Sequence, residues 1–341
     1  MRRSICLVFI LTFIVACMGT GADNGRSHRT TGRSGSVGTG LGGNSSAHTI
    51  RNVFVNATGN IFSATTEGLF ISTNGGTSFS NQTTTRGLGS NTVWGVHVDG
   101  LGTVYAATNG GLSISANNGF SFINKTIGQG LGSNIVWGVS VDGSGNIYAA
   151  TSGGLSISTN GGDSFTNKTT VQGLGNNDVR GIATDGSGNI YAATTGGLSI
   201  STNSGSSFIT RTTANGLGSN DTRGVAIDGT GNIYAATTEG LSISTNGGAS
   251  FINRTTAKGL GSNTVWGVYA DALGNIYAAT NGGLSISANG GSGFTNRTTR
   301  NGLSSDTIWG VFVDGLGKIY AATNGGLSVA PNTGANFTNK L

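Results

Sequence analysis

The chain has 341 residues, of which 63 are glycine and only one is proline. Charged residues make up 9% of it and the formal net charge is +5, without a basic run, which argues against a dedicated nucleic-acid binder. The three histidines, His28, His48 and His97, are too scattered to form a metal cluster or a Ser/His/Asp triad. We therefore expect no metal and no cofactor.

Residues 1–17 have the pattern of a targeting segment. A charged start precedes an apolar run over residues 5–16, which is too short to span a membrane comfortably. The run ends in Ile-Val-Ala-Cys at residues 14–17, which resembles the lipobox of bacterial lipoproteins. The resemblance implies cleavage before Cys17, diacylation of its thiol and attachment to a membrane through that lipid. The alternative is an ordinary signal peptide that happens to contain a cysteine.

Residues 18–48 are rich in Gly, Ser, Thr, Asn and Arg and contain almost no large apolar residue. Such a segment buries too little surface to offset the entropy lost on ordering, so we predict a flexible tether. With the lipobox resemblance, it implies an exported bacterial lipoprotein at the outer membrane or cell surface.

The rest of the chain, residues 49–341, repeats every 43 residues. Each copy has the pattern T-V-W-G-V-x-V-D, G-N-I-Y-A-A-T, G-L-S-I-S and S-F-x-N-R-T-T. A branched residue followed by Tyr or Phe marks each of seven copies: Ile61-Phe62, Val104-Tyr105, Ile147-Tyr148, Ile190-Tyr191, Ile233-Tyr234, Ile276-Tyr277 and Ile319-Tyr320. Repeats of this length are typical of propellers and solenoids.

Each copy contains short apolar runs separated by Gly/Asn/Ser turns, and no run has a helical period. In the third copy we predict strands over residues 136–142, 146–151, 154–158 and 164–169. The run Ile147–Ala150 is apolar on both faces, which indicates a sheet packed between two others. We predict an all-β, seven-bladed β-propeller with four antiparallel strands per blade, closed by packing the last blade on the first without exchanging a strand. An open solenoid is the alternative.

Two families share parts of this pattern. The run from Gly87 through Asp99, with Val104–Thr108 and Gly110-Gly111-Leu112, resembles the two-component-regulator propeller repeat. The turn Ser158–Phe165 resembles the Asp-box of sialidase-like propellers, a structural hairpin on the face opposite the usual binding mouth. Asparagine takes the Asp-box aspartate position in every copy: Asn74, Asn117, Asn160, Asn203, Asn246, Asn289 and Asn332. Both resemblances imply a propeller fold and leave the function open.

One repeat position carries only tryptophan or arginine and holds all four tryptophans of the chain. It lies near the beginning of the innermost strand, so in a propeller it should line the mouth of the central channel. Indole and guanidinium groups stack on sugar or aromatic faces, and guanidinium also binds carboxylate or phosphate. We predict a ligand-binding ring, with the alternative that the side chains merely wedge between blades: Arg51, Trp94, Trp137, Arg180, Arg223, Trp266 and Trp309.

Carboxylates accompany this ring. In blades four and five an aspartate stands two residues before the ring arginine, and residues i and i+2 share one side of a strand. We therefore predict two ion pairs, Asp178–Arg180 and Asp221–Arg223. Glu67 and Glu239 replace a glycine in the loop between the second and third strands, at the same mouth, where surface substitution is the simplest interpretation. We predict no catalytic residue; the alternative is a catalytic set drawn from Asp178, Asp221 and Glu239.

The outermost strand also carries a recurring polar position. Its residues should circle the rim, where charges on exposed edge strands hinder aggregation, and weak attraction to anionic glycans or lipids is the alternative. These residues are Gln82, Lys125, Lys168, Arg211, Arg254, Arg297 and Lys340.

These observations predict a monomeric, envelope-anchored, non-catalytic binding or scaffold propeller that recognises a glycan, peptide or protein partner at the channel mouth. Nucleic acid is not expected as a partner. Two alternatives stay open. One is a carbohydrate-active enzyme, a sialidase-like hydrolase or a lyase. The other is an extracytoplasmic sensor that signals through a partner kinase.

Overall fold

A computed structural model describes residues 48–331 and 334–341. The predicted targeting segment, Cys17 and nearly all of the predicted tether lie outside the described residues, as does Asn332. No described helix has the length and apolarity needed to span a membrane.

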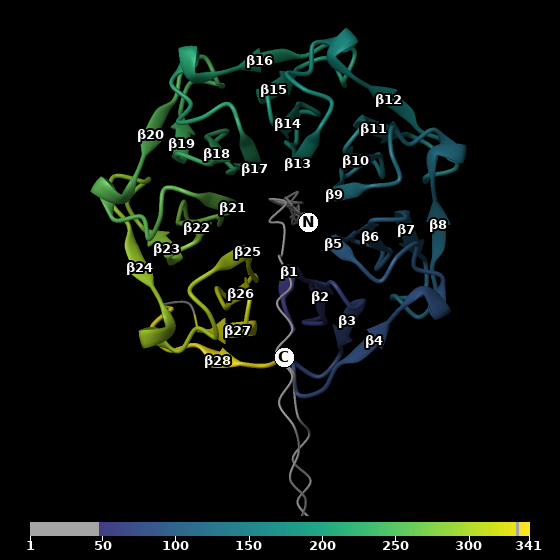
Figure 1. The fold of residues 1–341 in the computed structure, drawn as a ribbon, viewed down its shortest axis with the longest axis horizontal. Coiled ribbons are helices and arrows are strands. Elements are labelled where there is room, and N and C mark those ends of the chain that lie inside the picture. The colour runs from purple at the N-terminus through teal and green to yellow at the C-terminus, as the bar shows by residue number, and fades with distance from the viewer. Residues whose placement is uncertain (1–47, 332–333) are drawn as a thin grey trace, which may run out of the picture.

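Seven four-stranded antiparallel sheets surround a central axis like the blades of a propeller (Figure 1). Each blade is one sequence repeat, and its strands run in order from the axis to the outer edge. The seventh blade consists only of β25–β28 and the first only of β1–β4, so the ring closes without strand exchange. The predicted blade number, strand number and mode of closure are confirmed.

The elements have the following bounds. The innermost strands are β1 (Ile50–Val55), β5 (Val93–Val98), β9 (Val136–Val141), β13 (Val179–Thr184), β17 (Thr222–Ile227), β21 (Val265–Ala270) and β25 (Ile308–Val313). The second strands are β2 (Ile61–Thr65), β6 (Val104–Thr108), β10 (Ile147–Thr151), β14 (Ile190–Thr194), β18 (Ile233–Thr237), β22 (Ile276–Thr280) and β26 (Ile319–Thr323). The third strands are β3 (Leu69–Ser72), β7 (Gly111–Ser115), β11 (Gly154–Ser158), β15 (Gly197–Ser201), β19 (Gly240–Ser244), β23 (Gly283–Ser287) and β27 (Gly326–Ala330). The outermost strands are β4 (Ser80–Gln82), β8 (Ile123–Lys125), β12 (Thr166–Lys168), β16 (Ile209–Arg211), β20 (Ile252–Arg254), β24 (Thr295–Arg297) and β28 (Thr338–Asn339). The connections between blades contain the short 3-10 turns η1 (Thr84–Arg86), η2 (Ile127–Gln129), η3 (Thr170–Gln172), η4 (Thr213–Asn215), η5 (Thr256–Lys258) and η6 (Thr299–Asn301).

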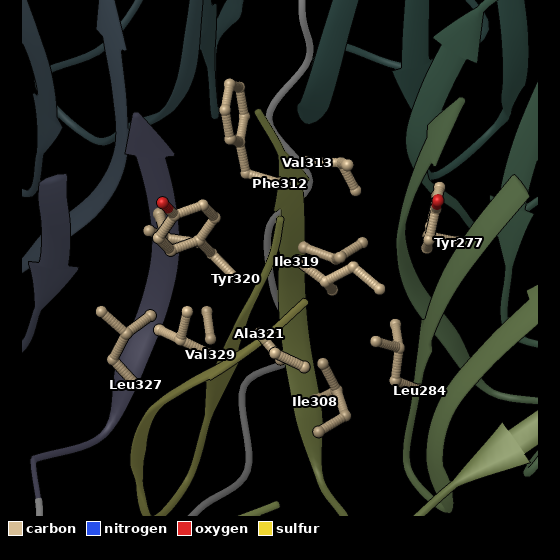
Figure 2. Packing of buried hydrophobic residues seen from close by; sticks show 14 of the residues in the cluster. Tyr277, Leu284, Ile308, Phe312, Val313, Ile319, Tyr320, Ala321, Leu327 and Val329 are labelled. Atoms are coloured by element: carbon tan, nitrogen blue, oxygen red, sulfur yellow. The ribbon is translucent and has the colours of Figure 1, made fainter. Parts of the chain in front are cut away.

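The hydrophobic core lies between the blades. All five residues of β10 are buried, as expected for a strand that is apolar on both faces. Figure 2 shows the same packing at the closure of the ring, where Ile308 and Ile319 of blade seven face Leu284 of blade six. Tyr320 and Leu327 point the opposite way, toward blade one. Because each sheet is covered on both faces, no single blade buries its apolar residues alone.

The aspartate that follows the innermost strand in six blades has a structural role. Asp142 accepts hydrogen bonds from the backbone N–H of Ser144 and Asn146, each at 2.9 Å, which closes the hairpin to β10. Its second oxygen accepts from the Tyr148 hydroxyl at 2.9 Å. Burial, followed by this bond, raises the pKa of Tyr148. In the next hairpin Asn160 accepts from Ser158 at 2.8 Å and from the Ser164 N–H at 3.1 Å, so this asparagine also holds a turn.

The 3-10 turns between blades were not predicted. Each ends at a glycine in the left-handed conformation, such as Gly130 with φ 94° after η2. The backbone N–H of Phe165 donates to the Gln129 carbonyl at 2.7 Å, which fastens the connection between blades two and three to the outer part of blade three. Because five further connections repeat this bond, each connection also ties its 3-10 turn to the blade that follows.

The basic side chains of the outermost strands lie differently from the prediction. The side chain of Lys125 is only 17% exposed, and its Nζ lies 3.6 Å from Asp163 Oδ1 in the β11–β12 hairpin of the next blade. A Cβ placed on Gly76 in blade one would lie 3.5 Å from Cγ of Lys340 in blade seven. These two lysines therefore lie across the seams between blades rather than standing free of the edge strands.

Candidate functional site

The seven predicted ring residues form one structure around the central axis, where the innermost strands begin, which we call the collar: Arg51, Trp94, Trp137, Arg180, Arg223, Trp266 and Trp309. Each is the second residue of an innermost strand. Each is also the extra residue of a β-bulge: Val93 pairs with Thr108 and Gly95 with Ala107, so Trp94 lies between two consecutive pairs of the register. The same shift occurs in the other six blades. A bulge changes the direction of a side chain, and here it does so identically in every blade.

The bulge was not predicted, although a sequence signal exists. A glycine follows the collar residue in six of seven copies, and Asn52 follows it in the first. Glycine within a strand often marks a bulge. Asn52 replaces that glycine and accepts a hydrogen bond from the Val96 backbone N–H of blade two at 3.2 Å.

Neighbouring collar residues contact one another. The rings of Trp94 and Trp137 have centroids 5.2 Å apart, and those of Trp266 and Trp309 are 4.7 Å apart. The guanidinium carbon of Arg51 lies 4.5 Å from the Trp309 ring and 5.2 Å from the Trp94 ring. These distances fit cation–π contacts, so one arginine joins the two indole pairs across the closure of the propeller.

The opposite side of the collar is a chain of ion pairs. Arg180 Nε lies 3.1 Å from Asp178, and Arg223 lies 3.0 Å from Asp221, so both predicted pairs are present. Asp221 also lies 3.3 Å from Arg180, which links blades four and five. Arg223 further lies 4.2 Å from the Trp266 ring. The chain of charges therefore continues into the second indole pair.

The indole N–H groups have partners that sequence reasoning missed. Trp94 donates to Asn109 at 2.6 Å, and Trp137 donates to Asp178 at 2.8 Å across the boundary between blades three and four. The remaining two donate in the same manner, Trp266 to Asn281 at 2.6 Å and Trp309 to Asn324 at 2.7 Å. Among the copies, asparagine occurs in this loop only where tryptophan occupies the collar without an aspartate nearby. That covariation was a usable signal.

The two glutamates, Glu67 and Glu239, lie in the loops between the second and third strands of blades one and five. Glu67 Oε2 lies 3.1 Å from His48 Nδ1, and the glutamate side chain is 59% exposed. Glu239 is exposed, and its backbone carbonyl accepts from Asn253 at 2.7 Å. Of the alternative catalytic set, Asp178 and Asp221 share the side chain of Arg180, and the loop that carries Glu239 is bonded to Asp221 through the Thr238 N–H.

Removing the bridging carboxylate should destabilise this side of the collar. In an Asp221→Ala variant, Arg223 loses its aspartate and Arg180 loses one of two, while the arginine side chains are only 11% and 17% exposed. We expect a loss of about 2 kcal/mol in the free energy of unfolding, measured by urea denaturation. Asp163→Ala is the control, because its ion pair involves an aspartate that is 82% exposed and should contribute about 0.5 kcal/mol or less. Equal losses in the two variants would contradict the bridging role.

No protein-family model matches the sequence, and no curated protein matches it. Solved structures do match. One is described as the extracellular domain of the hybrid two-component system BT3049 from B. thetaiotaomicron, with TM-score 0.69 and 21% identity, over 84% of this chain and 40% of that chain. Another is a GH74 enzyme from Niastella koreensis, with TM-score 0.65 and 17% identity, over 85% of this chain and 53% of that chain. A third is YCF48 bound to D1 peptide, with TM-score 0.63 and 12% identity, over 83% of this chain and 93% of that chain.

At these identities the likeness concerns the fold alone. The chain spans about two fifths of the length of the two-component-system structures it matches, since it covers 38% of one and 40% of another. The resemblance to regulator propellers noted in the sequence agrees with this likeness of fold. The chain is a seven-bladed β-propeller, and its fold is similar to part of these extracellular domains of two-component-system proteins.

Proposed function

We propose that this chain is an exported binding propeller whose collar is the seat of a ligand. The single observation that carries the proposal is the collar itself, in which bulges turn tryptophan or arginine in all seven blades toward one mouth. A fold closed only by packing needs no such alternation of indole and guanidinium. Aromatic faces beside charged, hydrogen-bonding groups are the usual composition of binding hot spots.

The ligand class that fits is a glycan or a peptide. Asn109, Asn281 and Asn324 accept the indole N–H through Oδ1, and each keeps two amide donors on Nδ2. Indole faces bordered by such donors suit sugar rings and peptide groups. YCF48, a solved propeller of similar extent, is described as bound to a peptide, so a propeller of this size suffices for peptide capture.

The alternatives have less support. In the enzyme alternative a carboxylate must act as an acid, base or nucleophile, yet Asp178 and Asp221 both pair with arginine, and Asp178 also accepts the Trp137 N–H. The likeness to a GH74 enzyme is a likeness of fold. The sensor alternative draws on the two-component-system structures, which are more than twice as long as the part that this chain matches. Export and attachment through lipid on Cys17 remain proposals that come from the sequence.

The test is binding of the full chain to glycan and peptide arrays. The test variant replaces one indole of each pair, Trp94→Ala together with Trp266→Ala. We expect it to lower the affinity for a captured ligand by roughly thirtyfold or more, because losing even one tryptophan of a binding site costs about 2 kcal/mol of binding free energy. Tyr148→Phe is the control, since it removes a hydrogen bond in the hairpin at the opposite end of the blade. Thermal unfolding verifies that both variants are folded. If the collar variant binds the same ligands with the same affinity as wild type, the collar is structural.

A further inference from the structure

Charge is distributed unevenly between the outer wall and the rest of the described surface. We define the outer wall as the outermost strands, the hairpins that lead into them, the 3-10 turns and Lys340. Its described residues contain nine basic side chains and one acidic side chain, Asp163. The 3-10 turns lie at the outer corners of the ring in Figure 1. We call the nine the basic belt: Arg86, Lys125, Lys168, Arg211, Arg254, Lys258, Arg297, Arg300 and Lys340.

Most acidic groups lie elsewhere. Six aspartates close the hairpins between the first and second strands, where Asp142 and its equivalents accept turn N–H groups and a tyrosine hydroxyl. Two more pair with the collar arginines. Asp306 accepts from the Thr299 N–H at 2.6 Å and is the acidic group beside η6. The described residues of the outer wall therefore carry one acidic side chain for nine basic ones.

The hairpins confirm this at the level of single residues. Lys125 reaches across its seam to Asp163, but the same hairpin position holds Ser206, Ala249 and Ser292 opposite Lys168, Arg211 and Arg254. Among the described residues, none of these three cations has a carboxylate within 4.0 Å. The Nε atoms of Arg211 and Arg254 are buried and have no hydrogen-bond partner in that part of the chain.

The spacing of these cations along the wall indicates which kind of anionic partner can contact several of them at once. Equivalent positions of successive blades lie at regular steps along a curved wall, and only a flexible chain can follow that curve. A flat bilayer would touch one sector at a time. Single-stranded nucleic acid binds through base stacking on aromatic side chains, yet Phe120 is the one aromatic residue of the described chain that is largely exposed, and all tryptophans lie in the collar.

We propose that the basic belt binds an anionic polysaccharide, a flexible chain of sugars with regularly spaced carboxylate or sulfate groups, along the arc from blade three to blade five. The site is separate from the collar, so the inference does not rest on the proposed function. Binding is driven by release of counterions from the polymer, and it weakens as salt concentration rises. Apolar stems of the seam residues stay packed between blades while their cationic ends face the polymer.

The experiment measures binding of the full chain to polygalacturonate by affinity electrophoresis at several salt concentrations, with neutral dextran as the control polymer. The variant is Lys168→Gln, Arg211→Gln and Arg254→Gln together, because blade one carries Gln82 at the same repeat position and glutamine is therefore compatible with the fold. We expect roughly a tenfold or greater loss of affinity at low salt and a shallower salt dependence. Asp163→Asn should instead strengthen binding, because it releases Lys125 from its ion pair.

Matched controls separate the belt from other sites. Lys318→Gln removes a lysine from the β25–β26 hairpin, outside the belt, and should bind nearly as wild type, whereas Arg254→Gln alone should bind more weakly. The collar variant Trp94→Ala with Trp266→Ala should also keep its affinity for polygalacturonate. The proposal is overturned if the triple variant binds as tightly as wild type or if dextran binds equally. Loss of binding in the collar variant, or tighter binding to single-stranded DNA or to vesicles with anionic lipid, would overturn it as well.

Discussion

Replacing Gly130 by alanine is expected to lower the free energy of unfolding by about 3 kcal/mol or more. Gly130 ends η2 with φ 94°, a conformation that alanine adopts only with strain. In addition, a Cβ at this position would collide with the backbone carbonyl oxygen of Phe165, which has no freedom to move because the Phe165 N–H is bonded to Gln129. Either the connection or the outer part of blade three would have to shift.

Gly145→Ala is the matched control for this prediction. Gly145 also has a positive φ, 82°, but a Cβ there would meet nothing within 4 Å. The Gly145→Ala substitution should lower the free energy of unfolding only through the strained backbone conformation, by about 1 kcal/mol. Denaturant unfolding of both variants measures the difference. If the two losses are the same, close packing of the inter-blade connection is not what requires glycine at position 130.

Acidification from pH 6.5 to pH 4 should destabilise the wild-type protein by about 3 kcal/mol more than a His97→Phe variant. His97 is buried in β5, with its ring centroid 5.2 Å from Phe54 and 6.3 Å from Tyr105. Burial lowers the pKa of His97 from 6.5 to about 4, although nearby Asp99 acts in the opposite direction. The folded protein therefore keeps this histidine neutral over a range in which the unfolded chain binds a proton.

The direction of the change in stability follows from the difference between the folded and unfolded pKa of His97. As pH falls through 6.5 the unfolded state gains a proton that the folded state does not, so stability decreases until about pH 4, where folded His97 is protonated as well. Well above pH 6.5 His97 is neutral in both states, so it adds no pH dependence to the free energy of unfolding. Phenylalanine is a suitable replacement because Phe54 and Phe312 occupy the same repeat position in blades one and seven. Urea midpoints of both proteins across this pH range provide the measurement. Parallel pH profiles would show that His97 does not titrate in this way.

The strand bounds show how accurately the local hydrophobic pattern predicts secondary structure in this chain. In the third copy the predicted strand 154–158 agrees with β11, and the predicted strand 146–151 differs from β10 by one residue. The outermost strand is shorter than predicted, Thr166–Lys168 rather than 164–169, because the Phe165 N–H bonds to the preceding connection instead of to β11. The pattern of apolar residues along a strand cannot reveal that a backbone group from another segment takes one of its hydrogen bonds.

The collar shows the same limit for a candidate site. All seven positions were identified from the alternation of tryptophan and arginine among the copies, and both ion pairs within blades followed from strand periodicity. The contacts across blades did not. Asp221 reaches Arg180, and Asp178 reaches Trp137, over 41 residues in each case. Spacing within a repeat contains no information about which neighbouring blade a side chain will meet.

The amino-acid sequence determined the number of blades, the four strands of each and the closure by packing, because a 43-residue unit that is apolar on both faces must be covered on both sides. It also determined which residues stand at the beginning of the innermost strands. Only the tertiary structure decided how those residues pair, since the bulge and the rotation between adjacent blades set which side chains come within hydrogen-bonding distance. The same rotation brings Lys125 of blade two within 3.6 Å of Asp163 in blade three, a contact that depends on which residue the next blade carries.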